Sequence, residues 1–312
     1  MLYYQPLLGL SAADSKVSNM TKQFPDWIRR KWSAGPEFHA TDAVLREFGL
    51  HTVCVSARCP NRGECWQQRI ATLMVLGDVC TRNCAFCAVK TGVPAAVDAD
   101  EPARVGQAVA KLGLHHAVIT SAARDDLPDG GSGHFAWVVE AVHAASPATT
   151  VEVLTPDFEG VRVHVERVLQ SRPEVFGHNI ETVEALYPVI RDQRYAYRRS
   201  LEVLRIAAQD AALVVKSGFM VGHGETREDI EQTLGDLREA GCRAVSIGQY
   251  LRPSSAQRPV CEYVTPEAFA SFEAYAREVG FEYAVAGPFV RSSYRAEMMY
   301  GKLNTRCDGE GH

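Results

Sequence analysis

The chain has 312 residues, of which 46% are hydrophobic and 23% are charged, and its formal net charge is −5. This length suffices for one large α/β barrel or two smaller domains, and the composition is ordinary for a globular protein. The negative charge gives no electrostatic reason to expect nucleic acid or an anionic membrane as a partner, and no apolar run approaches the length of a membrane span.

The first seventy residues are expected to contain a tail and a small extension. Residues 1–23 lack the basic start of a signal peptide, and we expect them to form a flexible tail. Residues 24–70 are the predicted N-terminal extension. Within it, residues 41–49 have a Thr/Asp start, apolar side chains three to four positions apart and a final glycine, which is the pattern of a helix.

From residue 71 onward, apolar runs alternate with amphipathic stretches. The apolar runs predict six buried strands, at residues 71–77, 117–121, 150–154, 175–178, 213–220 and 244–249. The amphipathic stretches predict helices at residues 101–113, 134–145, 161–170, 183–190, 201–208, 227–240 and 266–279. Apolar runs separated by helix-length segments are typical of parallel strands covered by helices, and no dinucleotide-binding glycine pattern follows the first strand.

We therefore predict an α/β fold, a partial (βα)6 barrel of the TIM type over residues 71–280. Parallel α/β barrels build their sites at the C-terminal ends of the strands, so we expect the site there. Residues 281–312 are the predicted C-terminal segment, which ends in a polar tail.

Six of the nine cysteines lie close together, in two groups of three. The groups are Cys54, Cys59 and Cys65 at the spacing C-x4-C-x5-C, and Cys80, Cys84 and Cys87 at the spacing C-x3-C-x2-C. Three thiolates on one short loop can hold three irons of a cubane [4Fe-4S] cluster and leave the fourth iron able to bind another molecule. Zinc is the alternative, but it takes four ligands, usually as two separated pairs. The clustering indicates metal binding in a reducing compartment, with the cytoplasm as the default location, rather than a disulfide framework.

Several stretches of the chain resemble the lipoyl synthase family of the radical S-adenosylmethionine (radical SAM) superfamily. Both cysteine groups have the family's order and spacing, an aromatic residue (Phe86) precedes the last cysteine, and Arg291-Ser292-Ser293-Tyr294 lies near the end. Other matching stretches are residues 59–61, 64–66, 77–82, 120–127, 178–182, 216–222 and 248–253. The resemblance runs from about residue 25 to residue 296. Its departures are Gly177, where Asn is commoner in the family, and His223, where a small or apolar residue is commoner.

The resemblance implies a radical enzyme that inserts sulfur. The group Cys80, Cys84 and Cys87 would hold the [4Fe-4S] cluster that binds S-adenosylmethionine and cleaves it to a 5′-deoxyadenosyl radical. This radical would take hydrogen from C6 and then C8 of an octanoyl chain attached to a lysine of a carrier protein. A second [4Fe-4S] cluster would supply the sulfur, held by Cys54, Cys59, Cys65 and, as a ligand that can be lost, Ser292. An unactivated C–H bond has no proton to remove and no carbonyl to polarise, so such a bond needs a cofactor radical.

Polar residues at the ends of predicted strands are candidates for contacts to the cofactor and the substrate. Phe86 belongs to the same set through its place beside the cysteines. Asn179 and Glu181 are expected to bind the ribose or the methionine end of S-adenosylmethionine, although both residue types also suit a helix N-terminus. The three that follow the second strand are expected to hold the methionine carboxylate or to face the substrate, and they are Thr120, Ser121 and Arg124.

Two later strands add further candidates. Lys216 lies in an apolar strand, where it must find a partner or shift its pKa, and we expect it to contact the cofactor or the substrate. At the end of the sixth strand, Gln249, Tyr250 and Leu251 are expected to cover the adenine. A basic stretch, interpreted as a solvated helix face, contains Arg191, Arg194, Arg198 and Arg199.

The resemblance also implies partners. These are octanoylated carrier proteins (the glycine-cleavage H protein and the lipoyl domains of 2-oxoacid dehydrogenases), an electron donor such as flavodoxin or ferredoxin, and an iron–sulfur cluster carrier. Two other functions compete with this one. They are a different radical SAM sulfur-inserting enzyme and a non-catalytic two-cluster electron carrier, which would need four cysteines per cluster.

Overall fold

The computed structural model describes residues 24–29 and 34–307. The expected flexible tail over residues 1–23 and the end of the expected polar tail over residues 308–312 lie outside the described residues.

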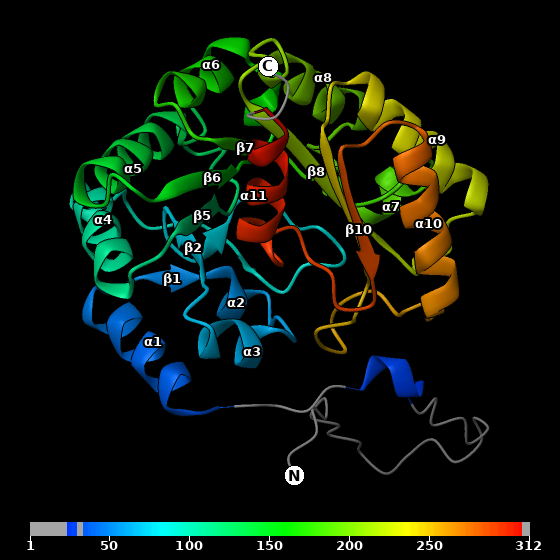
Figure 1. The fold of residues 1–312 in the computed structure, drawn as a ribbon, viewed down its shortest axis with the longest axis horizontal. Coiled ribbons are helices and arrows are strands. Elements are labelled where there is room, and N and C mark those ends of the chain that lie inside the picture. Colours follow the sequence, from blue (N-terminus) through cyan, green and yellow to red (C-terminus); the bar gives the residue numbers. More distant parts are fainter. Residues whose placement is uncertain (1–23, 30–33, 308–312) are drawn as a thin grey trace.

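A curved eight-stranded sheet organises the molecule, with helices around its outer side (Figure 1). Seven strands run parallel, and the short strand β1 pairs antiparallel with β2 at one edge. In spatial order the strands are β1 (His51–Thr52), β2 (Thr72–Val75), β5 (His116–Ser121), β6 (Thr150–Leu154), β7 (Val175–Gly177), β8 (Val214–Val221), β9 (Ala244–Gln249) and β10 (Tyr283–Gly287). Because β1 and β10 are the two edges, the sheet forms a partial barrel that stays open between them.

All six predicted strands are present and parallel. Their residues are nearly all buried, because parallel strands are covered on both faces. The sheet contains a seventh parallel strand, β10, which the sequence did not predict. Only Ala284 and Gly287 of its five residues are buried, so β10 lacks the continuous apolar run of the other strands.

Helices cover the outer face of this sheet. They are α4 (Glu101–Leu112), α5 (Ser132–Ala145), α6 (Arg162–Gln170), α8 (Tyr197–Ala207), α9 (Arg227–Glu239) and α10 (Pro266–Glu278). The helix predicted at residues 183–190 is instead two short turns, η3 (Glu184–Leu186) and α7 (Tyr187–Ile190). Capping residues fix several helix starts: Thr226 and Asp229 form a capping box on α9, and the Thr265 side chain accepts a hydrogen bond at the start of α10.

The N-terminal extension packs against the first strands of the barrel. It contains η1 (Asp26–Ile28), α1 (Pro36–Glu47), α2 (Val53–Ser56) and α3 (Arg62–Gln67). The predicted helix at residues 41–49 is α1, which begins earlier because Pro36 occupies the first helical position, where its missing N–H has no cost. The Thr41 hydroxyl of α1 donates to the Trp66 carbonyl of α3 over 2.9 Å.

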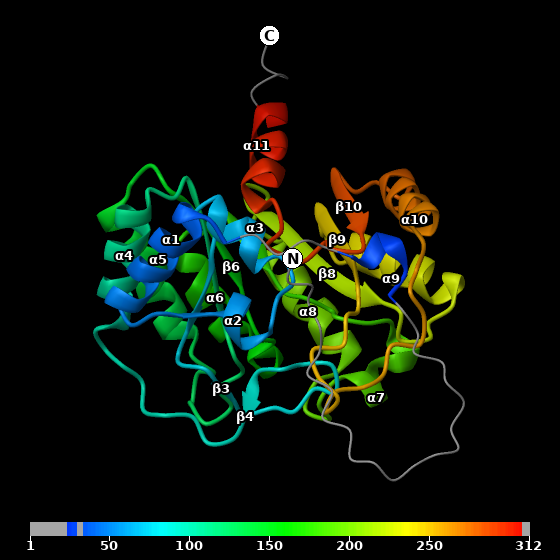
Figure 2. The same ribbon diagram turned by 90° about the horizontal axis from the view of Figure 1, so that it is seen from below.

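The last helix, α11 (Ala296–Cys307), closes the N-terminal end of the barrel. Met299 and Leu303 are buried against a cluster formed by the first residues of three strands, Val175, Val214 and Ala244. Figure 1 shows α11 across the middle of the sheet, and Figure 2 shows it standing out from the rest of the molecule. The expected polar tail therefore begins only after a helix that completes the core.

Two short elements lie at the opposite end of the barrel, β3 (Val79–Cys80) and β4 (Lys90–Thr91). They pair with each other and flank the second cysteine group. A further turn, η2 (Phe158–Gly160), precedes α6. Within the described ranges, none of the helices combines the length and apolar character that a membrane span requires.

Candidate active site

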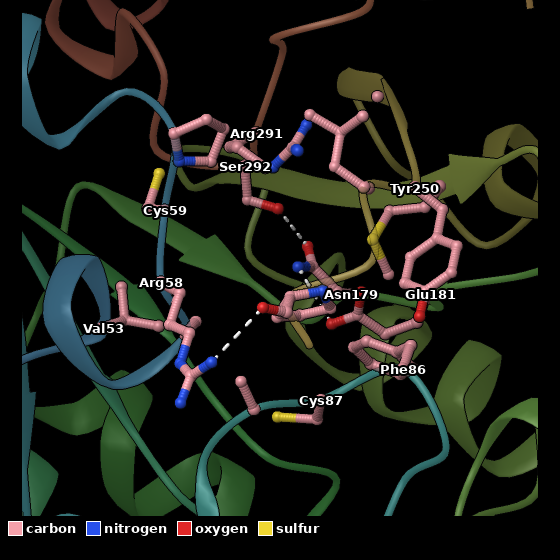
Figure 3. A pocket seen from close by; sticks show the side chains of 18 of the residues that line it. Val53, Arg58, Cys59, Phe86, Cys87, Asn179, Glu181, Tyr250, Arg291 and Ser292 are labelled. Carbon is pink, nitrogen blue, oxygen red and sulfur yellow. Dashed lines mark hydrogen bonds between the residues drawn. The ribbon is translucent and has the colours of Figure 1, made fainter. Parts of the chain in front are cut away.

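A cavity of about 1990 Å³ lies inside the barrel and opens at the C-terminal ends of its strands. Both cysteine groups and the predicted serine ligand line this one cavity: Cys54, Cys59, Cys65, Cys80, Cys84, Cys87 and Ser292. Figure 3 shows Cys59 and Ser292 on one side, Phe86 and Cys87 on the other, and Asn179 with Glu181 between them. The fold thus brings together two groups of thiols that the sequence places on separate segments.

The second cysteine group lies on the cluster loop, residues 80–87, which neighbouring segments fix on several sides. The Ala85 N–H donates to the Ile190 carbonyl over 2.9 Å, and the Ala85 carbonyl accepts from the Arg258 N–H over 3.0 Å. The Thr81 hydroxyl donates to Asp125 Oδ2 over 2.8 Å. These bonds position the loop before any ligand is bound.

Arg82 anchors the same loop from within the protein. Its guanidinium is buried and forms ion pairs with Asp125 (2.6 Å) and with the fully buried Asp157 (2.8 Å). It also lies over the Tyr195 ring, 3.9 Å from its centroid. Burial alone would lower the pKa of Arg82, but the hydrogen bond to Asp125 and the neighbouring acidic groups raise it, so the guanidinium stays charged. Nothing in the spacing of these residues predicts the arrangement.

The first cysteine group lies on two short helices and the turn between them. Cys54 is on α2, whose first turn is capped by the Thr52 side chain, and Cys65 is on α3. Asn61, between Cys59 and Cys65, donates its side-chain amide to the Phe289 carbonyl over 2.7 Å. This bond joins the cysteine-bearing turn to the C-terminal segment that carries Ser292.

That part of the C-terminal segment, the crossing segment (residues 288–295), passes close to the inner face of the barrel. It can do so because two strands carry glycine where it passes. A Cβ added to Gly218 on β8 would lie only 2.9 Å from Ser292 Oγ, and one added to Gly248 on β9 would clash with the Val290 carbonyl oxygen. The glycines therefore make room for Ser292 at the cavity wall.

The two adjacent serines have different partners. Ser292 Oγ donates to Asn179 Oδ1 over 2.6 Å, while Ser293 Oγ accepts from the Thr72 hydroxyl over 2.8 Å. Asn179 in turn donates to Glu181 Oε1 over 3.2 Å (Figure 3). Asn179 and Glu181 thus face the cavity, and the alternative that they cap a helix does not hold, since the next helical turn is capped at Val183.

Most other predicted contact residues also line the cavity, namely Phe86, Thr120, Ser121, Tyr250 and Leu251. The Thr120 hydroxyl donates to the Leu154 carbonyl over 2.8 Å, and the Tyr250 hydroxyl donates to the Arg258 carbonyl over 2.7 Å. The buried Ser121 Oγ has no hydrogen-bond partner among the described residues. Ser121 therefore keeps an unused donor and acceptor at the wall.

Three predicted contact residues do not line the cavity, and we correct their expected roles. Lys216 is buried and donates to Glu152 Oε1 over 2.8 Å, and Glu152 also contacts His116. Lys216 satisfies the requirement for a buried charge with a carboxylate in the core, and this pairing lowers the pKa of Glu152 although burial acts to raise it.

Gln249 and Arg124 hold loops. The Gln249 amide donates to the Glu262 carbonyl (2.9 Å) and accepts from the Val264 N–H (2.8 Å). The Arg124 guanidinium bonds to Asp126 (2.8 Å), to the Leu76 carbonyl (2.9 Å) and to the Ala95 carbonyl (3.0 Å). Their nitrogens and oxygens are therefore engaged within the protein, away from the cavity.

Arg191 is a cavity residue that the sequence interpretation missed. It was assigned to a solvated helix face, yet it lines the cavity, and its guanidinium carbon lies 3.5 Å from the centroid of the Tyr195 ring. Its Nε has no hydrogen-bond partner among the described residues. A basic residue directly after a predicted helix that ends at the sheet edge was the only available signal.

The thiols fit a soft metal cluster. Burial raises the pKa of Cys54 to about 11 and that of Cys87 to about 12, and burial also raises the pKa of Cys84. Cluster binding would replace these thiol protons, because iron–sulfur clusters are held by thiolates. Among the described residues, no three His, Cys, Asp or Glu side chains converge on a point suited to one metal ion. In a cubane each cysteine binds a different iron, so the sulfurs need not converge.

Comparison with known proteins agrees with this site. The family model of the radical SAM superfamily matches residues 74–248. Lipoyl synthase from Rubrobacter xylanophilus is 51% identical over 273 residues, covering 87% of this chain and 85% of the relative. Lipoyl synthase from Acidothermus cellulolyticus is 47% identical over 308 residues, covering 97% and 94%.

Solved structures agree in fold alone. The hydrogenase maturase HydG superposes with a TM-score of 0.54 at 13% identity, covering 68% of this chain and 50% of that one. SuiB from Streptococcus suis superposes with a TM-score of 0.52 at 11% identity, covering 73% and 53%. The predicted partial barrel and the resemblance drawn from the motifs are both confirmed, and the two competing functions are set aside. The chain therefore belongs to the lipoyl synthase family of the radical SAM superfamily and is an enzyme of that family.

Proposed function

We propose that this chain inserts two sulfur atoms, at C6 and C8, into an octanoyl chain attached to a lysine of a carrier protein, and so forms lipoyl-lysine. The observation that carries the proposal is that both cysteine groups line one cavity. Two separate sites would leave the radical and the sulfur donor apart, whereas one cavity lets a single extended chain reach both.

Each residue group has a distinct task in this proposal. Cys80, Cys84 and Cys87 hold the [4Fe-4S] cluster that takes S-adenosylmethionine, and Cys54, Cys59, Cys65 and Ser292 hold the second cluster, whose sulfides are consumed as substrate. When bound, the first cluster and S-adenosylmethionine supply a carbon-centred radical able to take hydrogen from an unactivated C–H bond.

Ser292 supplies the ligand that can leave. A serine oxygen is a hard ligand among soft thiolates, so it is the weakest match for iron in this set. In the structure its hydroxyl proton points at Asn179 Oδ1, a partner that keeps the oxygen in place when it carries its proton. Asn179 is therefore proposed to hold Ser292 both before the cluster binds and after it is lost.

The remaining wall residues bind, orient and exclude water. Asn179, Glu181, Thr120 and Ser121 supply polar contacts for the ribose and methionine groups. Apolar side chains, among them Phe86, Tyr250, Leu251 and Phe289, shield the reacting carbons. Burial raises the pKa of the Glu181 carboxyl, while Arg191 and Asn179 act in the opposite direction. Arg191 adds a permanent positive charge that supports an anionic group in the cavity.

The proposal includes a division of labour along the chain. Residues 24–70 carry the second cluster, residues 71–280 form the radical SAM barrel, and residues 281–312 supply Ser292, with residues 1–23 as a tail. The bond between Asn61 and Phe289 supports this division, because it couples the first cysteine group to the crossing segment.

The proposed partners follow from the chemistry. They are octanoylated H protein and lipoyl domains as substrates, flavodoxin or ferredoxin as electron donor, and a carrier that rebuilds the consumed cluster. The eight cysteines whose state the structure describes are free thiols, which supports action in a reducing compartment such as the cytoplasm.

The test is an anaerobic reaction of the reconstituted protein with dithionite, S-adenosylmethionine and an octanoyl-lysine peptide. Mass spectrometry should show the peptide gaining one and then two sulfur atoms, with 5′-deoxyadenosine as a second product. Formation of 5′-deoxyadenosine without any sulfur gain would show that the substrate is wrong. Absence of both products in protein with intact clusters would refute the proposal.

A further inference from the structure

A second hollow, of about 470 Å³, lies against the cluster loop. We name it the outer hollow, and it is lined by Asn83, Cys84, Ala85, Cys87, Arg252, Ser255, Ala256, Gln257, Arg258 and Pro259. Cys84 and Cys87 line both the outer hollow and the main cavity, whereas Cys80 lines only the main cavity. The stretch from Cys84 to Cys87 is therefore the shared wall between the two spaces.

This wall is one loop thick and is held from outside. Residues 255–259 pack on it, because the Arg258 N–H donates to the Ala85 carbonyl over 3.0 Å and the Gln257 side-chain amide donates to the Cys87 carbonyl over 3.1 Å. Figure 2 shows β3 and β4, which flank the cluster loop, at the rim of the molecule. A molecule in the outer hollow would lie close to two of the three cluster ligands without entering the main cavity.

The outer hollow is positively charged, although the chain as a whole has a net charge of −5. Two of its lining residues are arginines and none is acidic. The Arg252 guanidinium donates to the carbonyls of Gln257 and Ser255, which do not neutralise it, and Arg258 Nε has no hydrogen-bond partner among the described residues. The acid beside the loop, Asp192, is already paired with Arg194 at 2.8 Å.

We propose that the outer hollow is the docking site of an acidic electron-carrier protein that reduces the cluster held by the cluster loop. This inference rests on the proposed function, which assigns a cluster to Cys80, Cys84 and Cys87. The carrier loses one electron, the cluster gains one, and no atom moves between them. Within the main cavity the cluster faces S-adenosylmethionine and the octanoyl chain, so the outer side is the one that stays accessible during turnover.

Charge complementarity selects the partner. An acidic face meeting two arginines accelerates encounter and is sensitive to salt. The octanoylated carrier is the other macromolecule to consider, but its acyl chain must enter the main cavity, whereas the outer hollow lies behind the wall that closes it.

The experiment uses the enzyme with both clusters and compares two reductants. The rate of cluster reduction is followed by stopped-flow absorbance with reduced flavodoxin, and separately with dithionite, in wild type, Arg258→Glu and Arg258→Gln. Arg205→Glu is the matched control, because this arginine lies in the last turn of α8, at the opposite end of the barrel. We expect Arg258→Glu to slow reduction by flavodoxin about tenfold and Arg258→Gln about threefold.

Reduction by dithionite should keep its wild-type rate in all three variants, and the flavodoxin rate of wild type should fall with added salt. A wild-type flavodoxin rate in Arg258→Glu would overturn the docking proposal. So would a defect that appears only in the use of octanoylated carrier protein with dithionite as reductant. If Arg258→Glu loses cluster, Arg258→Gln decides, and an unchanged rate and salt dependence there overturns the proposal.

The two levels of inference fail in different ways. If dithionite reduces the wild-type cluster but S-adenosylmethionine is never cleaved, the proposed function fails whatever flavodoxin does. If dithionite supports cleavage and only the charge variants behave like wild type, the proposed function stands and the docking site is wrong.

Discussion

Ser292 and Ser293 are neighbours in the chain, but the structure gives them different tasks. Ser292 shares a hydrogen bond with the cavity residue Asn179, whereas Ser293 accepts a bond from Thr72 on β2. Only Ser292 lies where Gly218 leaves space on β8. The choice between two identical residue types could not be made from the sequence alone.

We expect Ser292→Ala and Ser293→Ala to separate these tasks. Ser292→Ala should still form 5′-deoxyadenosine but should insert sulfur more than about 100-fold more slowly, because even an outer partner of a metal ligand is worth 10–100-fold. Ser293→Ala should keep both reactions and lose about 1 kcal/mol of unfolding free energy, since the buried Thr72 hydroxyl loses its acceptor. Peptide mass spectrometry and urea denaturation provide the two readouts. The reverse pattern would make Ser293 the iron ligand.

His223 contributes to the pH dependence of stability. Its ring is buried, stacks on Tyr250 with a centroid distance of 4.2 Å, and neither ring nitrogen has a hydrogen-bond partner among the described residues. Burial, and then the charge of Arg258, lower the pKa of His223 from 6.5 to about 4. The unfolded chain therefore takes up this proton near pH 6.5 and the folded chain only near pH 4.

Stability should therefore fall as the pH is lowered from 7 to 5, and His223 alone accounts for about 2 kcal/mol of that loss. We expect His223→Leu to match or exceed the wild-type stability at pH 7 and to show a shallower decline. His178, whose pKa burial also lowers to about 4, is present in both proteins and accounts for part of the remaining slope. Equal slopes for wild type and variant in urea denaturation at pH 7 and pH 5 would contradict this account.

At the scale of elements, predictability followed burial. The six predicted strands were found because their residues form unbroken apolar runs, as in β9, where all six residues are buried. Strand β10 and helix α11 were missed for the opposite reason. β10 has only two buried residues, and the described core contacts of α11 come mainly from Met299 and Leu303.

The candidate site divides in the same way. Cysteine spacing predicted the two thiol groups, because ligands of one cluster lie close together in the chain. Lys216 was misassigned because its partner Glu152 is 64 residues away, and no local pattern announces that pair. The contacts of Arg82 with Asp125 and Asp157, and the place of Arg191 at the cavity wall, depend likewise on tertiary structure.

Helix α11 should act as a structural plug. Met299 is 1% exposed and packs against the strand ends, whereas its neighbour Met298 is 52% exposed. Met299→Ala should cost about 2–4 kcal/mol of unfolding free energy, through lost burial and the cavity left behind. Met298→Ala should stay within about 0.5 kcal/mol of wild type. Similar losses for both variants would mean that α11 does not close the barrel as described.

At the scale of the whole molecule, segments from both ends of the chain complete the cavity of an open barrel. The extension before β2 carries one cysteine group, and the crossing segment after β10 carries Ser292. Hydrogen bonds from Asn61 to Phe289 and from Thr72 to Ser293 join the two directly. The sulfur-donor half of the site is therefore formed by the two segments together, next to a radical half that belongs to the barrel.

This arrangement predicts that the two halves can be separated chemically. Replacing Cys54, Cys59 and Cys65 together by Ala should lower the iron and sulfide content by about half, because one of two equal clusters is lost. The barrel keeps its own cysteines, so reductive cleavage of S-adenosylmethionine should persist while the octanoyl peptide gains no sulfur. Replacing Cys80, Cys84 and Cys87 by Ala should also remove half of the iron, yet it should abolish both reactions. Cys261→Ala is the control: this exposed cysteine lines the same cavity outside both groups, so iron content and both reactions should be unchanged. Iron and sulfide analysis, nucleoside chromatography and peptide mass spectrometry on the three proteins test the assignment. Loss of S-adenosylmethionine cleavage in the first variant, with the second cluster's iron intact, would show that the two halves do not act independently.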